Sequence, residues 1–328
     1  AGLILLSTVH TFLAFFIIYV LVVYLGYTAG FFHPTSAAVN SWFIRNRGIA
    51  LGILASASGL GGVALVPLLS FLVLSQGWRL AAAVAGIIIL TLAMPMALPF
   101  HRTPESRGLR PDGMPPQSRG SSAQTAGPAE VDLSLGQALR TSNFWMLTLS
   151  ITLRVGVTHA VLVHLVPIVV WKGLDEATGA YLVGLYAFLS IAAPLLLGWL
   201  GDRWSKTMVS ALGALSGLAG LVLVLLTQGA VSGYILAISL ALIMGTTPLN
   251  WALIGDFFGR RSYASLRGMM GLVYSLATFV SPVYAGWVFD RTQSYTEALI
   301  VFSVILAVVT PLFALLRAPS PSQQAPRR

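Results

Sequence analysis

Arg154 is the one charged residue deep inside an apolar stretch of this sequence, and a buried guanidinium is a natural partner for an anion. It lies about ten residues into the stretch, which at roughly 1.5 Å per helical residue is about 15 Å, near the middle of a bilayer. Ser150 and Thr158, four residues before and after it, would share its helical face. Such a charge costs about 2.5 to 3.5 kcal/mol unless a cavity or a partner receives it. We expect a polar stripe on a water-filled cavity with Arg154 as an anion site; the alternative is a structural arginine bonded to carbonyl groups of a neighbouring helix.

Five further polar side chains interrupt the apolar stretches at depths where a substrate pathway would run. His33 precedes the helix-distorting Pro34, and Thr246 and Asn250 are spaced to share one helical face. For a histidine inside a span, the alternative is a hydrogen-bonded packing residue. The complete set of candidate substrate-binding residues is Arg154, His33, Asn250, Thr246, Ser150, Thr158, His164 and Tyr274.

A charged turn, "LGWLGDRWSK" at 197–206, follows a long apolar run. Gly198 and Gly201 would let neighbouring helices approach closely. Asp202 is placed to accept hydrogen bonds from the N-terminus of another helix, and Arg203 to pair with an acid or with carbonyl groups. We therefore predict that Gly198, Gly201, Asp202 and Arg203 form a gate, the alternative being ordinary loop charges.

Composition identifies the elements that must position these residues. Residues 1–43 and 207–255 contain no Asp, Glu, Lys or Arg, and the mean hydropathy is +0.84, so the chain is not a soluble protein with amphipathic helices. There is no cysteine and no Gly-x4-Gly-Lys-Ser/Thr sequence, and we predict no catalytic residue, metal site or cofactor. The apolar segments are 1–9, 13–43, 48–75, 80–100, 143–171, 177–200, 207–228, 231–255, 268–289 and 298–316.

Basic residues gather on one side when the segments are threaded alternately. That side receives Arg45, Arg47, Arg102, Arg107, Arg110, Arg119, Arg140, Arg203, Lys206, Arg260, Arg261, Arg267, Arg317, Arg327 and Arg328, and the other side only Arg79, Lys172 and Arg291. By the positive-inside rule, the first side is cytoplasmic. Orientation accounts for the net charge of +9, so we predict no nucleic-acid partner.

The chain divides at a stretch rich in Pro, Ser, Gly and Arg. We predict a first helical bundle at 1–100, a cytoplasmic linker at 101–142, a second bundle at 143–317 and a disordered cytoplasmic tail at 318–328. The end of the linker, "DLSLGQALR", predicts a short surface helix with Asp132 as its cap. The segments "WFIRNRGIALGI" (42–53) and "FFGRRSYASLRGMM" (257–270) resemble each other, which indicates a parallel duplication.

Four motifs carry a resemblance to the major facilitator superfamily, in its monocarboxylate transporter and oxalate:formate antiporter branch. "GFFHPTSAAVNSWFIRNRGIALG" resembles the signature of spans four and five, "GWLGDRWSK" the second copy of the cytoplasmic loop motif, and "GDFFGRRSYASLRGMMG" and "SPVYAGWVFDRTQSY" parts of spans ten and eleven. The resemblance implies two six-helix bundles, with the first two spans and most of the third missing here. It also implies alternating access by rocking bundles.

Two departures from the branch leave the substrate open. Pro194 stands where monocarboxylate members carry an arginine, and the eleventh span lacks the lysine of the oxalate members. No Asp or Glu lies deep in a span, so a co-transported proton would need a carboxylate outside this chain, or else His33 or His164.

We predict a monomeric, multi-pass secondary transporter of the cytoplasmic membrane that binds a small organic anion such as a monocarboxylate. The alternatives are a carrier of a non-anionic solute and a receptor or scaffold on the same fold. We predict that the chain is not an enzyme: an intramembrane aspartyl protease needs two apposed aspartates at depth, whereas Asp202 and Asp256 lie at span ends.

Overall fold

The computed structural model describes residues 1–98, 101, 103–113 and 132–317, and in these residues regular structure is entirely helical. Nine helical stretches among them are long and apolar enough to cross a membrane. They are Phe12–Trp42, Arg47–Gln76, Trp78–Ala97, Ser142–Val163, Glu176–Arg203, Lys206–Leu226, Gly229–Phe258, Tyr263–Thr292 and Thr296–Leu315. Within the described residues, the apolar segments predicted from the sequence are therefore confirmed as largely helical; residues 99–100 of the predicted segment 80–100 lie outside the described residues. The predicted disordered tail at 318–328 and residues 114–131 of the linker lie outside the described residues.

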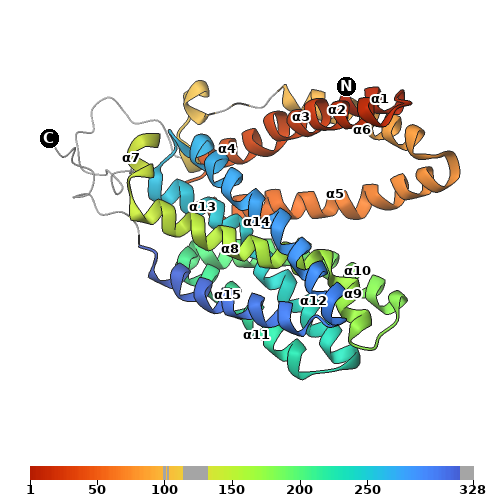
Figure 1. Ribbon diagram of the computed structural model, residues 1–328. Coiled ribbons are helices and arrows are strands. Elements are labelled where there is room, and N and C mark those ends of the chain that lie inside the picture. Colours follow the sequence, from red (N-terminus) through yellow and green to blue (C-terminus); the bar gives the residue numbers. More distant parts are fainter. Residues whose placement is uncertain (99–100, 102, 114–131, 318–328) are drawn as a thin grey trace. The chain divides into compact units, whose positions relative to one another are not determined.

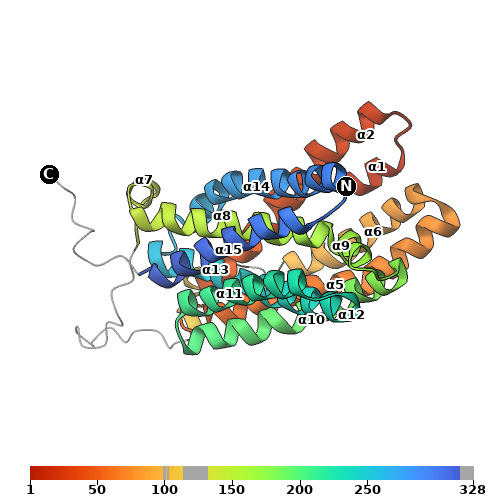
Figure 2. The same ribbon diagram turned by 60° about the horizontal axis from the view of Figure 1, so that its bottom comes forward.

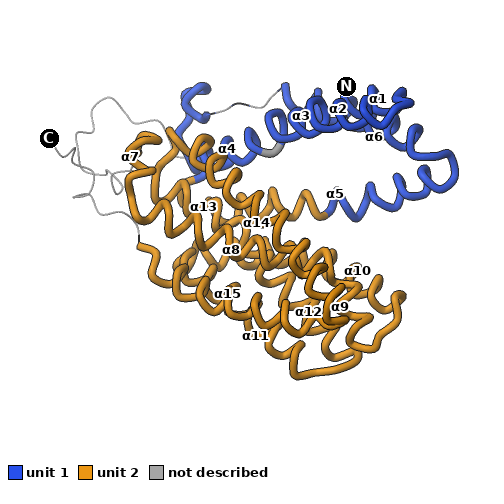
Figure 3. Tube along the Cα trace, in the orientation of Figure 1, with its two compact units in different colours: residues 1–43, 60–119 blue, residues 44–59, 120–328 orange. Residues whose placement is uncertain are grey.

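Contacts within the chain separate two compact units, coloured in Figure 3: residues 1–43 with 60–119, and residues 44–59 with 120–328. The boundary falls inside helix α5 (Arg47–Gln76), whose first thirteen residues pack with the second unit. The predicted bundle boundaries at residues 100 and 143 stay a prediction.

The first unit contains α1 (Gly2–Ser7), the remainder of α5, α6 (Trp78–Ala97) and one long helix at 12–42. That long helix is composed of α2 (Phe12–Ile18), η1 (Tyr19–Tyr24), α3 (Leu25–Tyr27), η2 (Thr28–Phe32) and α4 (His33–Trp42), where η1 and η2 are π-helical. Pro34 lacks the N–H that an α-helical turn requires, so the wider turn just before it has a local cause. Two short 3₁₀ turns follow α6, η3 (Pro104–Arg107) and η4 (Pro111–Gly113).

The second unit is a helical bundle in which α8 (Ser142–Val163) lies beside α14 (Tyr263–Thr292), and α11 (Lys206–Leu226) beside α15 (Thr296–Leu315) (Figures 1 and 2). α12 (Gly229–Gly245) packs against α10 (Glu176–Arg203) and α11. Small residues bring helices close: a Cβ at Gly217 would lie 2.6 Å from the Ile243 side chain on α12.

Two spans of this unit are interrupted shortly before a proline. α8 ends at Val163 and α9 (Leu165–Trp171) begins after His164, with Pro167 as its third residue. α12 ends at Gly245 and α13 (Thr247–Phe258) begins after Thr246, with Pro248 as its second residue. Because proline cannot donate to the carbonyl four residues earlier, each break leaves backbone acceptors for side chains of neighbouring helices.

The end of the linker forms the expected short helix, α7 (Leu135–Leu139), but its cap differs from the prediction. Ser134, not Asp132, caps α7 in a capping box with Gln137. Asp132 instead accepts a hydrogen bond from the Arg261 amide (3.0 Å) in the turn between α13 and α14. A carboxylate two residues before the cap position lies too far from the first turn of α7 to satisfy its amides.

Candidate functional site

Arg154 lies fully buried on α8 and binds the break between α12 and α13. Its Nη1 donates to the carbonyl oxygen of Ile243 (3.0 Å), and its Nη2 donates to Oγ1 of Thr247 (3.2 Å). A positive charge therefore meets the carbonyl end of the half-helix α12, where the helix dipole is negative.

Asn250, also fully buried, completes this arrangement from α13. With its amide oxygen turned toward Arg154, Oδ1 accepts from Nη2 (2.9 Å) and Nε (3.1 Å), and the amide nitrogen donates to Oγ of Ser210 on α11 (3.3 Å). We call Arg154, Thr247, Asn250, Ser210 and the Ile243 carbonyl the Arg154 cluster. Four hydrogen bonds to neutral acceptors match the structural alternative for Arg154, and its role as an anion site stays a prediction.

Ser150 and Thr158 lie on α8 one turn before and one turn after Arg154, and their role on a water-filled cavity stays a prediction. Ser150 and Thr158 are buried, and their hydroxyls donate to carbonyls of their own helix, Met146 (2.7 Å) and Arg154 (3.0 Å). Away from water, the nearest free acceptor for a helical Ser or Thr is the carbonyl one turn earlier.

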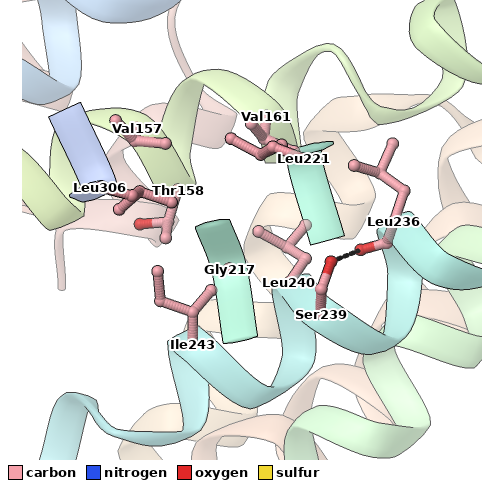
Figure 4. Close-up of a pocket in the computed structure, with 10 residues that line it drawn as sticks. All are labelled: Val157, Thr158, Val161, Gly217, Leu221, Leu236, Ser239, Leu240, Ile243 and Leu306. Atoms are coloured by element: carbon pink, nitrogen blue, oxygen red, sulfur yellow. Dashed lines mark hydrogen bonds between the residues drawn. The ribbon is translucent and has the colours of Figure 1, made fainter. Parts of the chain in front are cut away.

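A small pocket lies beside Thr158 (Figure 4). It offers about 10 Å³ of room to a water-sized sphere, roughly the space of a single water molecule. Apolar side chains dominate its wall, and the Ser239 hydroxyl points back to the Leu236 carbonyl (3.2 Å). We interpret it as a packing defect. Its lining residues are Val157, Thr158, Val161, Gly217, Leu221, Leu236, Ser239, Leu240, Ile243 and Leu306.

Thr246 occupies the break between α12 and α13. It is fully buried, and its hydroxyl donates to the Ile243 carbonyl (2.7 Å), which Arg154 also contacts. Gly213 on α11 makes room for the Thr246 methyl group, since a Cβ there would collide with it. These contacts are those of a packing residue, and a role of Thr246 in substrate binding stays a prediction.

His164 lies half-buried at the break between α8 and α9 and joins three elements. Its Nε2 is 3.0 Å from the carbonyl oxygen of Pro282 in α14, and its Nδ1 is 2.9 Å from the hydroxyl of Tyr295, just before α15. Tyr295 is buried in an aromatic cluster, stacked on Phe289. Burial, and then the charge of Asp290, raise the pKa of the Tyr295 hydroxyl, so it stays a hydrogen-bond donor.

The remaining two candidates are in different surroundings. Tyr274 on α14 lies with its ring 5.8 Å from that of Trp251 on α13. The guanidinium of Arg267 lies over the same Trp251 ring, 4.5 Å from the ring centroid. Arg267 is buried, with 3% of its surface exposed. His33 begins α4 in the first unit, and its role in substrate binding stays a prediction.

Asp202, at the end of α10, accepts hydrogen bonds from the first turn of α5. The amides of Gly48 and Ile49 donate to its two carboxylate oxygens at 2.8 and 2.7 Å. This is the geometry expected from the sequence, a carboxylate on the positive end of another helix. The gating role assigned to Asp202 stays a prediction.

Three further charges surround Asp202, although the sequence prediction treats them only as charges of loops and span ends. Lys206 contacts both Asp202 (3.2 Å) and Asp256 (3.0 Å), and Arg47 pairs with Asp256. Two signals were present in the sequence. Lys206 lies four residues after Asp202, across the short turn from α10 to α11, and Arg47 is the first residue of α5. We call Arg47, Asp202, Lys206, Asp256 and the amides of Gly48 and Ile49 the Asp202 cluster.

The two predicted glycines do permit close approach. A Cβ at Gly198 would lie 2.6 Å from the Gly48 carbonyl oxygen, so α5 and α10 contact through their backbones. A Cβ at Gly201 would collide with the side chain of Leu249 on α13. These approaches position the Asp202 carboxylate against α5.

Arg203 is a correction: it does not pair with an acid in the described structure. Its guanidinium lies 4.2 Å from the centroid of the Trp199 ring, one turn earlier on α10. Helical side chains lean toward the N-terminus of their helix, which brings Arg203 over Trp199, while Lys206 takes the acidic partners.

Comparison with known proteins agrees with this architecture. Residues 1–282 match the model of the Major Facilitator Superfamily. The outward conformation of the transporter FucP superposes on this chain with a TM-score of 0.51 and 14% sequence identity, over 97% of both chains. A variant of the E. coli fucose:proton symporter FucP superposes with a TM-score of 0.50 and 15% identity, also over 97% of both chains. The predicted all-helical fold and resemblance are confirmed, and so is the prediction of a multi-pass membrane protein that is not an enzyme.

Similar curated proteins are monocarboxylate transporters. Monocarboxylate transporter 12 of Mus musculus is 26% identical, and the match covers 85% of this chain and 62% of the transporter. Monocarboxylate transporter 11 of Homo sapiens is 28% identical, and the match covers 84% of this chain and 58% of the transporter. Monocarboxylate transporter 13 of Bos taurus is 25% identical over 89% and 67%. The chain thus spans about three fifths of the length of the first two relatives.

Proposed function

Since the chain belongs to the Major Facilitator Superfamily, we propose that it is part of a secondary active transporter that moves a small organic anion, such as a monocarboxylate, by alternating access. The names of the relatives support the substrate class. A carrier of this kind exposes its site to one side of the membrane at a time, so it needs contacts that hold one side closed and then release.

The observation that carries the proposal is the Asp202 cluster. One carboxylate accepts two amide hydrogen bonds from the start of α5, and Lys206, Asp256 and Arg47 continue the contact. In the predicted division, α5 belongs to the first bundle and α10 to the second, so the cluster would tie the bundles at one end. Breaking the Asp202 cluster would not unfold a helix, because each helix keeps its own backbone hydrogen bonds.

An anion would enter the Arg154 cluster by exchange. Asn250 Oδ1 takes the hydrogen bonds of Nε and Nη2, the edge of the guanidinium that suits a carboxylate. A carboxylate would offer this edge two parallel acceptors and an opposite charge, where Asn250 offers one neutral oxygen, so it would replace Asn250 there. We propose this exchange as the recognition step, with Asn250 as the neutral occupant of the empty state.

We further propose that the linker and C-terminus are cytoplasmic and that the carrier acts in the cytoplasmic membrane as a monomer. The excess of basic residues on the linker side supports this orientation. The Asp202 cluster would then close the cytoplasmic side.

Counterflow in proteoliposomes containing the full-length protein tests the function. Vesicles loaded with unlabelled L-lactate should take up labelled lactate faster than empty vesicles, because a carrier exchanges solute across the membrane. A neutral solute of similar size, glycerol, is the control for the substrate class. Exchange of neither solute would contradict the carrier and favour a receptor or scaffold on this fold; exchange of glycerol alone would contradict the anion.

A further inference from the structure

His164 lies between α8 and α9, directly after the last residue of Ser142–Val163, which is one of the described spans. The carboxylates of these spans all lie near span ends: Glu176, Asp202, Asp256, Asp290 and Glu297. His164 stands at the break between α8 and α9, where side-chain bonds connect it to two other helical elements.

The partners of His164 limit how the ring can carry its protons. A carbonyl oxygen only accepts, so Nε2 carries the hydrogen that points to Pro282. In a neutral ring Nδ1 is then an acceptor for the Tyr295 hydroxyl, and in a protonated ring Nδ1 donates to the oxygen of that hydroxyl. The same contacts therefore fit both protonation states of His164.

Building on the proposed carrier function, we propose that His164 is the proton-binding residue of this carrier and takes up, at Nδ1, a proton that moves together with the anion. The incoming proton bonds to Nδ1 and the ring becomes a cation, while Nε2 keeps its bond to Pro282. Nδ1 then donates to the Tyr295 oxygen, and the hydroxyl hydrogen of Tyr295 must turn to another acceptor. One proton thus reverses the bond between the α8–α9 break and the start of α15.

The charged and titratable groups around His164 determine whether its ring can become a cation. Tyr295 is the titratable group in direct contact, and Asp290, near the end of α14, is the charge that acts on Tyr295. From α9, Lys172 lies over the Trp171 ring, which contacts Tyr295, and its ammonium donates to the Thr227 carbonyl (2.9 Å). On α8 itself, His159 lies five residues earlier.

The test is accumulation of labelled L-lactate driven by a pH gradient in proteoliposomes of the full-length protein. Coupling of one proton to one lactate should give about tenfold accumulation per pH unit, the thermodynamic limit for equal stoichiometry. His164→Gln keeps a donor and an acceptor but cannot be protonated, so accumulation should fall to a ratio of about one, and any residual exchange should no longer vary with pH.

His159→Gln is the matched control on the same helix and should accumulate lactate as the wild type does. Accumulation that persists in a folded His164→Gln protein would overturn the proposal. Wild-type exchange that ignores a pH gradient would also overturn it, while leaving the carrier function intact.

A second measurement tests the role of His164 even if the wild-type protein does not transport lactate. Histidine ring signals in the labelled protein, assigned through His164→Gln and His159→Gln, report protonation without any substrate. A His164 signal that titrates between pH 5 and 8, and whose midpoint is displaced by Tyr295→Phe, supports the proposal. A ring that stays neutral throughout this range contradicts it.

Discussion

The two charged clusters of the second unit differ in what neutralises the charge. In the Arg154 cluster a buried guanidinium meets only neutral acceptors, a carbonyl, a hydroxyl and an amide. In the Asp202 cluster, opposite charges meet each other and a helix N-terminus, and the Asp256 side chain is 28% exposed. The first is closed to water, whereas water can replace contacts in the second.

This difference separates a contact that fixes one geometry from a contact that can be released. A buried charge without its acceptors is costly, so the Arg154 cluster holds α8 against the α12–α13 break. Partly exposed ion pairs contribute modestly and are screened by salt, so the Asp202 cluster can open at low cost. Variants of each cluster can test this distinction.

The largest effect should follow Arg154→Ala. It leaves acceptors unsatisfied at Thr247 and Asn250 and opens a cavity, so we expect a loss of about 2 to 5 kcal/mol in unfolding free energy. Arg154→Lys should recover only part of the lost unfolding free energy, since an ammonium group cannot match the planar arrangement of the acceptors. Thermal stability in detergent measures both. Arg203→Ala, an exposed stacked arginine, is the control and should change little.

The anion role of Arg154 makes the opposite prediction for these variants. If the guanidinium serves mainly an anion, Arg154→Ala should fold normally and lose anion affinity, because removal of a buried charge eases insertion. Lactate binding measured beside thermal stability separates the two roles. Wild-type affinity in a well-folded Arg154→Ala protein would end the anion hypothesis, including the exchange with Asn250.

The sequence predicted the spans and the Asp202 contact because both depend on local information. Hydropathy fixes where a helix can cross, and an acid beside small residues at a span end has few partners other than a helix N-terminus. The partners of Arg154 could not be predicted. The spacing of Ser150 and Thr158 shows that they share a helical face with Arg154, but not which neighbouring helix that face contacts. That contact depends on the break at Thr246, which a single proline two residues later only weakly indicates.

The same limit explains the errors around Asp202. Arg203 and Lys206 are both basic and near Asp202, so charge alone cannot rank them. Their positions on the helices decide: Arg203 lies over Trp199, and Lys206, first in α11, reaches both carboxylates. Residues far apart in sequence, such as Arg47 and Asp256, meet only through the packing of α5 against the second unit.

Asp202→Asn should have the next largest effect, and on transport rather than on folding. The amide keeps the shape but presents an N–H₂ group to one of the two backbone donors, which should cost about 1.5 to 3 kcal/mol of the contact. We expect slower lactate counterflow with normal insertion, and a smaller difference from the wild type at high salt. Normal flux in this variant would reduce Asp202 to a loop residue.

Gly198→Ala should weaken the same contact by a steric route. The new methyl group would meet the Gly48 backbone, which cannot move aside as a side chain can, and overpacking costs about 1 to 3 kcal/mol. Spin labels at Asn46 and Thr207, simple to attach in a chain without cysteine, should report a longer distance between α5 and α11. Gly184→Ala, on the same helix with open space around it, is the matched control. An unchanged distance in Gly198→Ala would contradict a contact that depends on close approach.

Ser205→Cys should have the smallest effect, and it decides which compartment supplies water to the Asp202 cluster. Ser205 caps α11 through the Met208 amide (3.4 Å), so its loss should cost only about 0.5 to 2 kcal/mol of helix stability and leave counterflow nearly unchanged. If the cluster closes the cytoplasmic side, the cysteine in intact cells should react with a permeant maleimide and not with an impermeant one. Ser294→Cys, in the turn between α14 and α15, should show the reverse. Rapid labelling of residue 205 from outside would invert the proposed orientation, and the releasable cluster would then close the outer side, while the stability predicted for the Arg154 cluster would be unaffected.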